Sequence, residues 1–197
     1  MITNIIRLGY AVLCITGLLL SVFGIMRPAA AGSDSAVINF SAVFVGGSCE
    51  ISASVPEIVF GGGELIEPDE IVSNPLPTAF NLTLTGCGGW GLTPKVTVSG
   101  ESTTLFGPAL FRSSMPESAS DGYGILLSTL GNNSFNANTN LADTKVITAK
   151  NWSMDTDLSG LDTILPVTAT LTCGDCNYSG RRSGDLIASV TFDFVYD

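Results

Sequence analysis

The sequence LIASVTFDFVYD, residues 186–197, places an apolar or aromatic side chain at every second position. Alternation with a period of two predicts a β-strand that has one face on a hydrophobic core. In this sequence only Asp197 follows the strand, so its pairing partner has to be sought elsewhere. The alternating side chains are Leu186, Ala188, Val190, Phe192, Phe194 and Tyr196.

The rest of the chain, from about residue 37, also has the pattern of β structure. Short alternating or β-branched segments are separated by clusters of Gly, Pro, Asn and Ser, which is typical of an antiparallel sandwich of about seven strands. Residues 61–70 and 111–122 are predicted to be loops with room for a helical turn. The further strand candidates are 49–55, 57–60, 79–87, 94–100, 123–130, 145–150 and 163–173.

The first 31 residues have a different composition. Arg7 precedes a mostly apolar run that ends near Met26, and Ala29-Ala30-Ala31 follows as an A-x-A site. This order predicts a secretory signal peptide over 1–31. The alternative is a retained membrane helix, because the apolar run is just long enough to cross a bilayer.

The negative charge of the chain argues against nucleic acid and anionic lipid as partners. After removal of 1–31, six Lys and Arg residues remain against 18 Asp and Glu, a formal charge of −12. Such a surface repels nucleic acid and anionic lipid, so neither is an expected partner. Insertion into a membrane after signal cleavage is not expected either.

The cysteines and the absence of histidine limit the disulfides, catalytic sites and metal sites that the chain can form. Cys49, Cys87, Cys173 and Cys176 remain after cleavage, and an even count behind a signal peptide predicts two disulfides in an oxidising compartment. Their order suggests Cys49–Cys87 and Cys173–Cys176, although four cysteines allow three connectivities. The sequence has no histidine, which removes Ser-His and Cys-His catalysis and histidine metal sites. We therefore predict no catalytic, metal or cofactor residues.

A second alternating segment lies near the start of the mature chain. Ile38, Phe40, Ala42 and Phe44 fall on one face of 37–45, Gly46-Gly47 ends the segment, and Cys49 comes next. Cys87 follows 38 residues later, and the final strand reads A-x-V-x-F-x-F-x-Y-x from Ala188 to Asp197. This combination resembles the subunits of chaperone–usher fimbriae, the pilins of type 1 and P pili.

The resemblance implies a fold, a mechanism and a set of partners. The fold would be an immunoglobulin-like sandwich that lacks its last strand, so that strand 186–196 forms one wall of a hydrophobic acceptor groove. A periplasmic chaperone would fill the groove, and residues 37–45 of a neighbouring subunit would replace the chaperone at an outer-membrane usher. The implied domains are a signal peptide (1–31), a donor-strand extension (32–47) and a pilin domain (48–197).

The resemblance thus predicts a non-enzymatic structural subunit, exported through the periplasm to the cell surface, that supports adhesion. One departure is Ala42, which stands where the family commonly has glycine. Alanine is small enough to fit a shallow pocket, and the sequence leaves open whether its methyl group slows strand exchange. Three alternatives stay open: a self-closed sandwich in which 37–45 pairs with the chain's own last strand, an adhesive tip subunit that binds a glycan or protein, and a secreted enzyme or metal-binding sandwich.

Three further motifs have simpler interpretations. Cys173-Gly-Asp-Cys176 has C-x-x-C spacing but lacks the helical context of a redox motif, so a structural disulfide is expected. Asp155-x-Asp157 opens a calcium-loop pattern that ends on Pro166 where a glutamate is needed, which indicates a solvated acidic turn. The four acids of 64–70 are expected to lie on a solvated loop.

Overall fold

The structure is a computed structural model that describes residues 39, 41, 46–114, 116 and 118–197. Every helix and strand of the described part belongs to one compact unit, residues 43–197. The predicted signal peptide and the alternating side chains of 37–45 lie outside the described residues. Within the described part, no helix is long and apolar enough to span a membrane.

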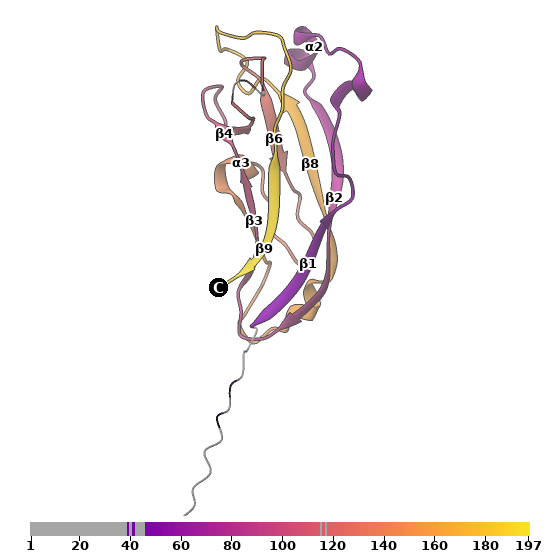
Figure 1. Ribbon diagram of the computed structural model, residues 1–197, viewed down its shortest axis with the longest axis vertical. Helices are drawn as coiled ribbons and strands as arrows, with labels where there is room; N and C mark the ends of the chain where they lie inside the picture. Colours follow the sequence, from indigo (N-terminus) through magenta and orange to yellow (C-terminus); the bar gives the residue numbers. More distant parts are fainter. Residues whose placement is uncertain (1–38, 40, 42–45, 115, 117) are drawn as a thin grey trace, which may run out of the picture. The chain divides into compact units, whose positions relative to one another are not determined.

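The larger of two sheets has six strands in the order β1-β2-β8-β6-β5-β4 (Figure 1). All of its strand pairs are antiparallel. The long strands β2 and β8 pair over their centres, with Leu82 opposite Leu165. The bounds are β1 Gly47–Ala53, β2 Leu76–Gly89, β4 Ser102–Thr103, β5 Leu110–Phe111, β6 Gly124–Ser128 and β8 Thr163–Thr172.

The smaller sheet has three strands in the order β7-β3-β9 and is also antiparallel. Its strands are β7 Val146–Thr148, β3 Pro94–Gly100 and β9 Val190–Tyr196. The central strand β3 places Val96 opposite Phe194 and Val98 opposite Phe192 of β9. The strand that ends the sequence is therefore an edge strand of this sheet.

The two sheets enclose one hydrophobic core. Alternate residues of β2 and β8 are buried, as Leu82, Leu84 and Leu165 show, and Val96 and Val98 of β3 are buried opposite them. This alternation confirms the predicted all-β antiparallel sandwich, because one residue in two of each strand faces the core.

Two short α-helices and two 3-10 helices complete the described part. η2 covers Phe60–Gly63, α2 covers Pro68–Ser73, α3 covers Leu141–Thr144 and η3 covers Leu158–Leu161. The predicted strand at 57–60 is wrong: Phe60 begins η2, and Gly61 and Gly62 have φ of 69° and 65°, which a strand cannot accommodate. Asn140 caps α3 by accepting hydrogen bonds from Ala142 and Asp143.

Strand β9 begins four residues later than residue 186, the predicted start. β3 ends at Gly100, which lies opposite Val190, so residues 186–189 have no ladder partner on that strand. The carbonyl of Ile187 instead accepts a hydrogen bond from the Ser113 N–H at 2.7 Å. Leu186 and Ala188 remain packed against the core, but they precede the strand.

Candidate functional site

The candidate site is the open edge formed by β1 and β9, each of which ends its sheet. Cα atoms of β1 approach those of β9 to within 8 Å, yet the two strands do not pair. Among the described residues neither strand has a second strand neighbour. Figure 1 shows β1 and β9 at the border between the two sheets.

The inner side chains of β9 are incompletely covered. Val98 of β3 is only 2% exposed and Val96 is fully buried, whereas their partners across the ladder, Phe192 and Phe194, are both partly exposed. The remaining inner residues of the terminal segment, Leu186, Ala188, Val190 and Tyr196, are also partly exposed. The core is therefore fully covered beside β3 and only partly covered beside β9.

The facing border of the larger sheet is also apolar and partly covered. Ile51 of β1, together with Ile58, Phe60 and Ile66 from the connection to β2, packs against the core without being buried. The ring of Phe192 meets that of Phe80 on β2 edge to face, with centroids 6.1 Å apart. Partly exposed apolar side chains thus come from both sheets at the open edge.

The backbone of β9 adds unsatisfied hydrogen-bonding capacity. An antiparallel edge strand points about half of its N–H and C=O groups away from its one partner, here β3. Such a row of free groups pairs readily with another extended chain. The open edge can therefore accept a strand through both its backbone and its apolar side chains.

Both ends of β9 are fixed. At its end, Thr93 and Asp197 exchange two backbone hydrogen bonds of 3.0 and 3.1 Å, and the ammonium of Lys95 pairs with the Asp197 carboxylate. At its start, the Ser118 hydroxyl bonds the backbone of Ile187, and the Ser120 N–H donates to the carbonyl of Asp185 at 2.9 Å. Strand β9 is therefore tied to the rest of the domain at both of its ends.

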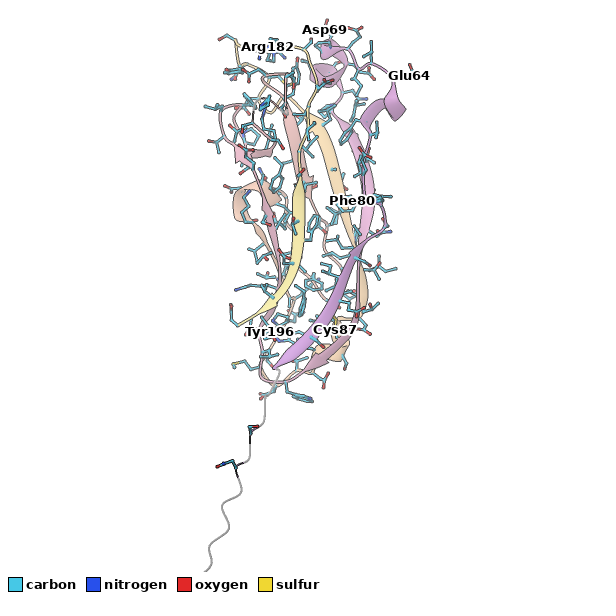
Figure 2. All side chains as sticks on the ribbon, viewed as in Figure 1. Glu64, Asp69, Phe80, Cys87, Arg182 and Tyr196 are labelled. Atoms are coloured by element: carbon cyan, nitrogen blue, oxygen red, sulfur yellow. A yellow bond between two sulfur atoms is a disulfide. The ribbon has the colours of Figure 1, made fainter. Side chains whose placement is uncertain are left out.

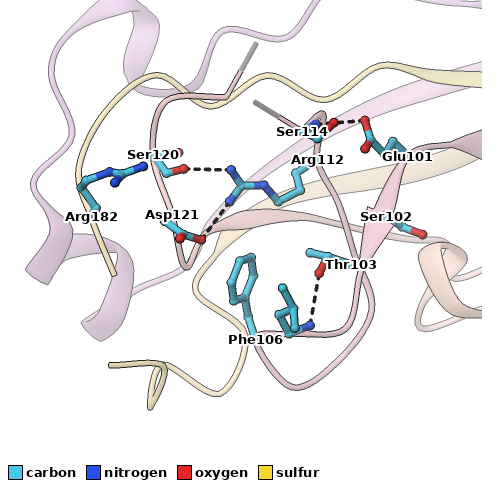
Figure 3. A pocket seen from close by; sticks show the side chains of 10 residues that line it. Glu101, Ser102, Thr103, Phe106, Arg112, Ser114, Ser120, Asp121 and Arg182 are labelled. Atoms are coloured by element: carbon cyan, nitrogen blue, oxygen red, sulfur yellow. Dashed lines mark hydrogen bonds and ion pairs between the residues drawn. The ribbon is translucent and has the colours of Figure 1, made fainter. Parts of the chain in front are cut away.

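Arg112 organises the loop that holds the start of β9. Its buried guanidinium donates to the carbonyl of Ser120 at 2.8 Å and lies 3.9 Å from the Asp121 carboxylate (Figure 3). It also donates to the carbonyl of Tyr123 at 3.1 Å. The same group lies 5.6 Å from the centroid of the Phe106 ring. Arg112, Ser120, Asp121 and Phe106 are among the residues that line a cavity of about 350 Å³. Sequence reasoning missed Arg112, because an isolated arginine in a predicted loop has no distinguishing pattern.

The four cysteines in the described part of the chain form two disulfides, Cys49–Cys87 and Cys173–Cys176. The first joins β1 to β2 near the open edge. The second closes the turn after β8, in which Gly174 and Cys176 have positive φ and the Cys176 N–H donates to the carbonyl of Cys173. This segment is a turn, and it lacks the helix that a thiol oxidoreductase places after its first cysteine.

The acidic residues are dispersed. Asp157 caps η3, and hydrogen bonds from Ser159 hold the pKa of its carboxyl below the usual value. Asp162 accepts a hydrogen bond from the Cys87 N–H at 2.8 Å. All four acids of 64–70 are exposed: Glu64 and Glu67 on the connection between η2 and α2, and Asp69 and Glu70 on α2. In the part of the chain that is described, no three His, Cys, Asp or Glu residues are grouped to hold a metal ion.

Comparison with known proteins gives only distant similarity. No protein-family model and no curated protein matches the sequence. Among solved structures, the crystal structure of the P pilus rod subunit PapA is similar, with 16% identity, a TM-score of 0.45, and coverage of 82% of this chain and 100% of that chain. A structure of a chaperone–usher pilus that addresses rod uncoiling has 15% identity, a TM-score of 0.41, and coverage of 84% of this chain and 97% of that chain.

Proposed function

We propose that this chain is a structural subunit of a chaperone–usher fimbria that polymerises by donor-strand complementation. The observation that carries the proposal is the contrast between β9 and β3: adjacent strands of one sheet have inner side chains that are partly exposed on β9 and buried on β3. A closed secreted sandwich would bury both rows. A missing strand beside β9 accounts for the difference.

Residues 37–45 have the pattern needed to supply that strand. Ile38 to Phe44 spans seven residues, as does β9, and each segment has an apolar side chain at alternate positions. Burial of Ile38, Phe40 and Phe44 would contribute up to about 1.5–3 kcal/mol each. A one-residue slip would turn these side chains outward, so the register of the inserted strand is specified.

The proposal includes the other steps of such a pathway. The chain is exported to the periplasm, where a chaperone supplies a temporary strand to the open edge and prevents edge-to-edge aggregation. At an outer-membrane usher, the 37–45 segment of the next subunit replaces it. The role is structural, and catalysis has no part in it.

The test uses a variant that lacks residues 32–46, with and without a synthetic peptide of residues 36–46. We expect slow, saturable binding of the peptide and a large rise in the melting temperature. A peptide with Phe40→Asp should fail, because the charge would enter the core, whereas the control Ser41→Asp should bind, because the same charge faces outward. Mature protein that is a stable monomer and indifferent to the peptide would instead show that 37–45 closes its own sandwich.

A further inference from the structure

The pole of the sandwich where β1 begins exposes two large apolar side chains. Trp90 is 63% exposed and Met154 is 60% exposed. Their turns are joined by a 3.0 Å hydrogen bond from the Gly91 N–H to the Met154 carbonyl. We call Trp90 and Met154 the root surface, because the N-terminal segment joins the domain beside them at Gly46.

Close packing places Gly46 beside the root surface. A Cβ atom on Gly46 would lie 3.1 Å from the Leu92 side chain and 3.6 Å from the Tyr196 ring. The Leu92 carbonyl in turn accepts a 2.8 Å hydrogen bond from the indole of Trp152. The root of the 32–45 segment, the end of β9 and the exposed Trp90 therefore share one pole of the sandwich.

The opposite pole also exposes apolar side chains. Leu65 is 98% exposed and Val59 is 59% exposed, both on the connection between β1 and α2. Figure 2 places the neighbouring Glu64 and Asp69 at the same end as Arg182, which precedes β9, and places Tyr196 at the other end. We call Leu65 and Val59 the far surface; it lies at the end of the sandwich from which β9 starts.

The short linker between donor strand and domain restricts how two copies can meet. Only Val45 and Gly46 separate Phe44 from Gly47, the first residue of β1, so these two ends are at most about 10 Å apart. Antiparallel insertion beside β9, the direction of every strand pair described here, places Phe44 next to Val190. The donor's root surface then lies within reach of the acceptor's far surface.

We propose that the root surface of one copy docks on the far surface of the next copy, as a second contact beside the inserted strand. This inference rests on the proposed function, since the inserted strand brings the two surfaces together. The second copy is the partner because the linker leaves no room for another protein between the poles. Trp90 is the expected anchor, because large aromatic side chains contribute most to such interfaces.

The first test measures association of the full mature protein. Trp90→Ser and Leu65→Ser should each weaken subunit–subunit association by at least about tenfold. Leu130→Ser is the matched control, because Leu130 is 92% exposed but belongs to neither surface. Binding of the 36–46 peptide should be unchanged in all three variants. If Trp90→Ser and Leu65→Ser associate as tightly as Leu130→Ser, the docking contact is overturned and donor-strand complementation stands. If the peptide does not bind at all, donor-strand complementation fails, and the docking contact fails with it.

The second test determines which poles of two neighbouring subunits face each other. The described cysteines are all in disulfides, so new ones report unambiguously. Mixing Met154→Cys protein with Leu65→Cys protein should give an intersubunit cross-link, and each variant alone should give little. Efficient cross-linking of Met154→Cys protein to itself would place root against root, as parallel insertion requires, and would overturn the proposal.

Discussion

Phe192 lies opposite Val98 across the β9–β3 ladder and meets Phe80 of the larger sheet edge to face, at a centroid separation of 6.1 Å. One side chain thus connects the open edge to both sheets. Its ring is nevertheless only partly buried, while Val98 is 2% exposed. Phe192 is therefore the residue at which core stability and strand acceptance should be most closely coupled.

We predict that Phe192→Ala lowers the free energy of unfolding by about 2–4 kcal/mol, somewhat less than for a fully buried phenylalanine. It should also weaken peptide binding, since an inserted strand would cover the missing ring. Urea denaturation with and without the peptide separates the two effects. Thr191→Ala, on the exposed face of the same strand, is the control and should change neither quantity appreciably.

Arg112 should act on β9 through the loop it holds. Arg112→Met leaves the carbonyls of Ser120 and Tyr123 without their donor, which should cost about 2–3 kcal/mol. The exposed Arg181→Met is the matched control. Hydrogen exchange should speed up at the Ser113 and Ile187 amides, which tie the start of β9 to this loop. Unchanged exchange there would show that the loop holds β9 without Arg112.

The pH dependence should include a contribution from Glu101. Hydrogen bonds from Ser114 lower the pKa of the Glu101 carboxyl in the folded protein. A carboxyl with a lowered folded pKa stabilises the protein above its unfolded pKa of about 4.3, and this contribution disappears as the pH falls through the folded value. Glu101→Gln should therefore lose less stability than the wild type between pH 7 and pH 3, as measured by thermal unfolding. An identical loss would mean that the Ser114 contact is absent in solution.

The two disulfides should differ in their effect on stability. Cys49 and Cys87 are 38 residues apart, and Cys173 and Cys176 are 3 residues apart. Because loop-closure entropy grows with loop length, loss of the first should cost about 4 kcal/mol and loss of the second about 2 kcal/mol. Double serine variants of each pair, compared by denaturant unfolding, test this order. The reverse order would indicate that residual structure in the unfolded chain dominates.

The longer strands could be predicted from the sequence, because alternating apolar and polar residues indicate a strand with one buried face. Segment 94–100 matches β3, and the segments 79–87 and 163–173 lie on β2 and β8. The two-residue strands β4 and β5 are too short to have a period. The Arg112 contacts depend on carbonyls that only the folded loop brings together. The start of β9 was also unpredictable, since it is set by the end of its partner at Gly100.

Gly100 offers a last test, because it controls the point at which β9 begins. A Cβ atom there would lie 2.7 Å from the backbone carbonyl of Ser189 and 3.1 Å from the Phe111 ring, and a backbone atom cannot move aside as a flexible side chain can. Gly100→Ala should therefore cost about 1–3 kcal/mol and weaken peptide binding, by displacing the first residues of the acceptor strand. Gly88→Ala is the matched control, since a Cβ there meets nothing within 4 Å. If Gly100→Ala unfolds and binds peptide like Gly88→Ala, the close approach of Ser189 does not fix the start of β9, and the hydrogen bonds of Asp185 and Ile187 must hold it.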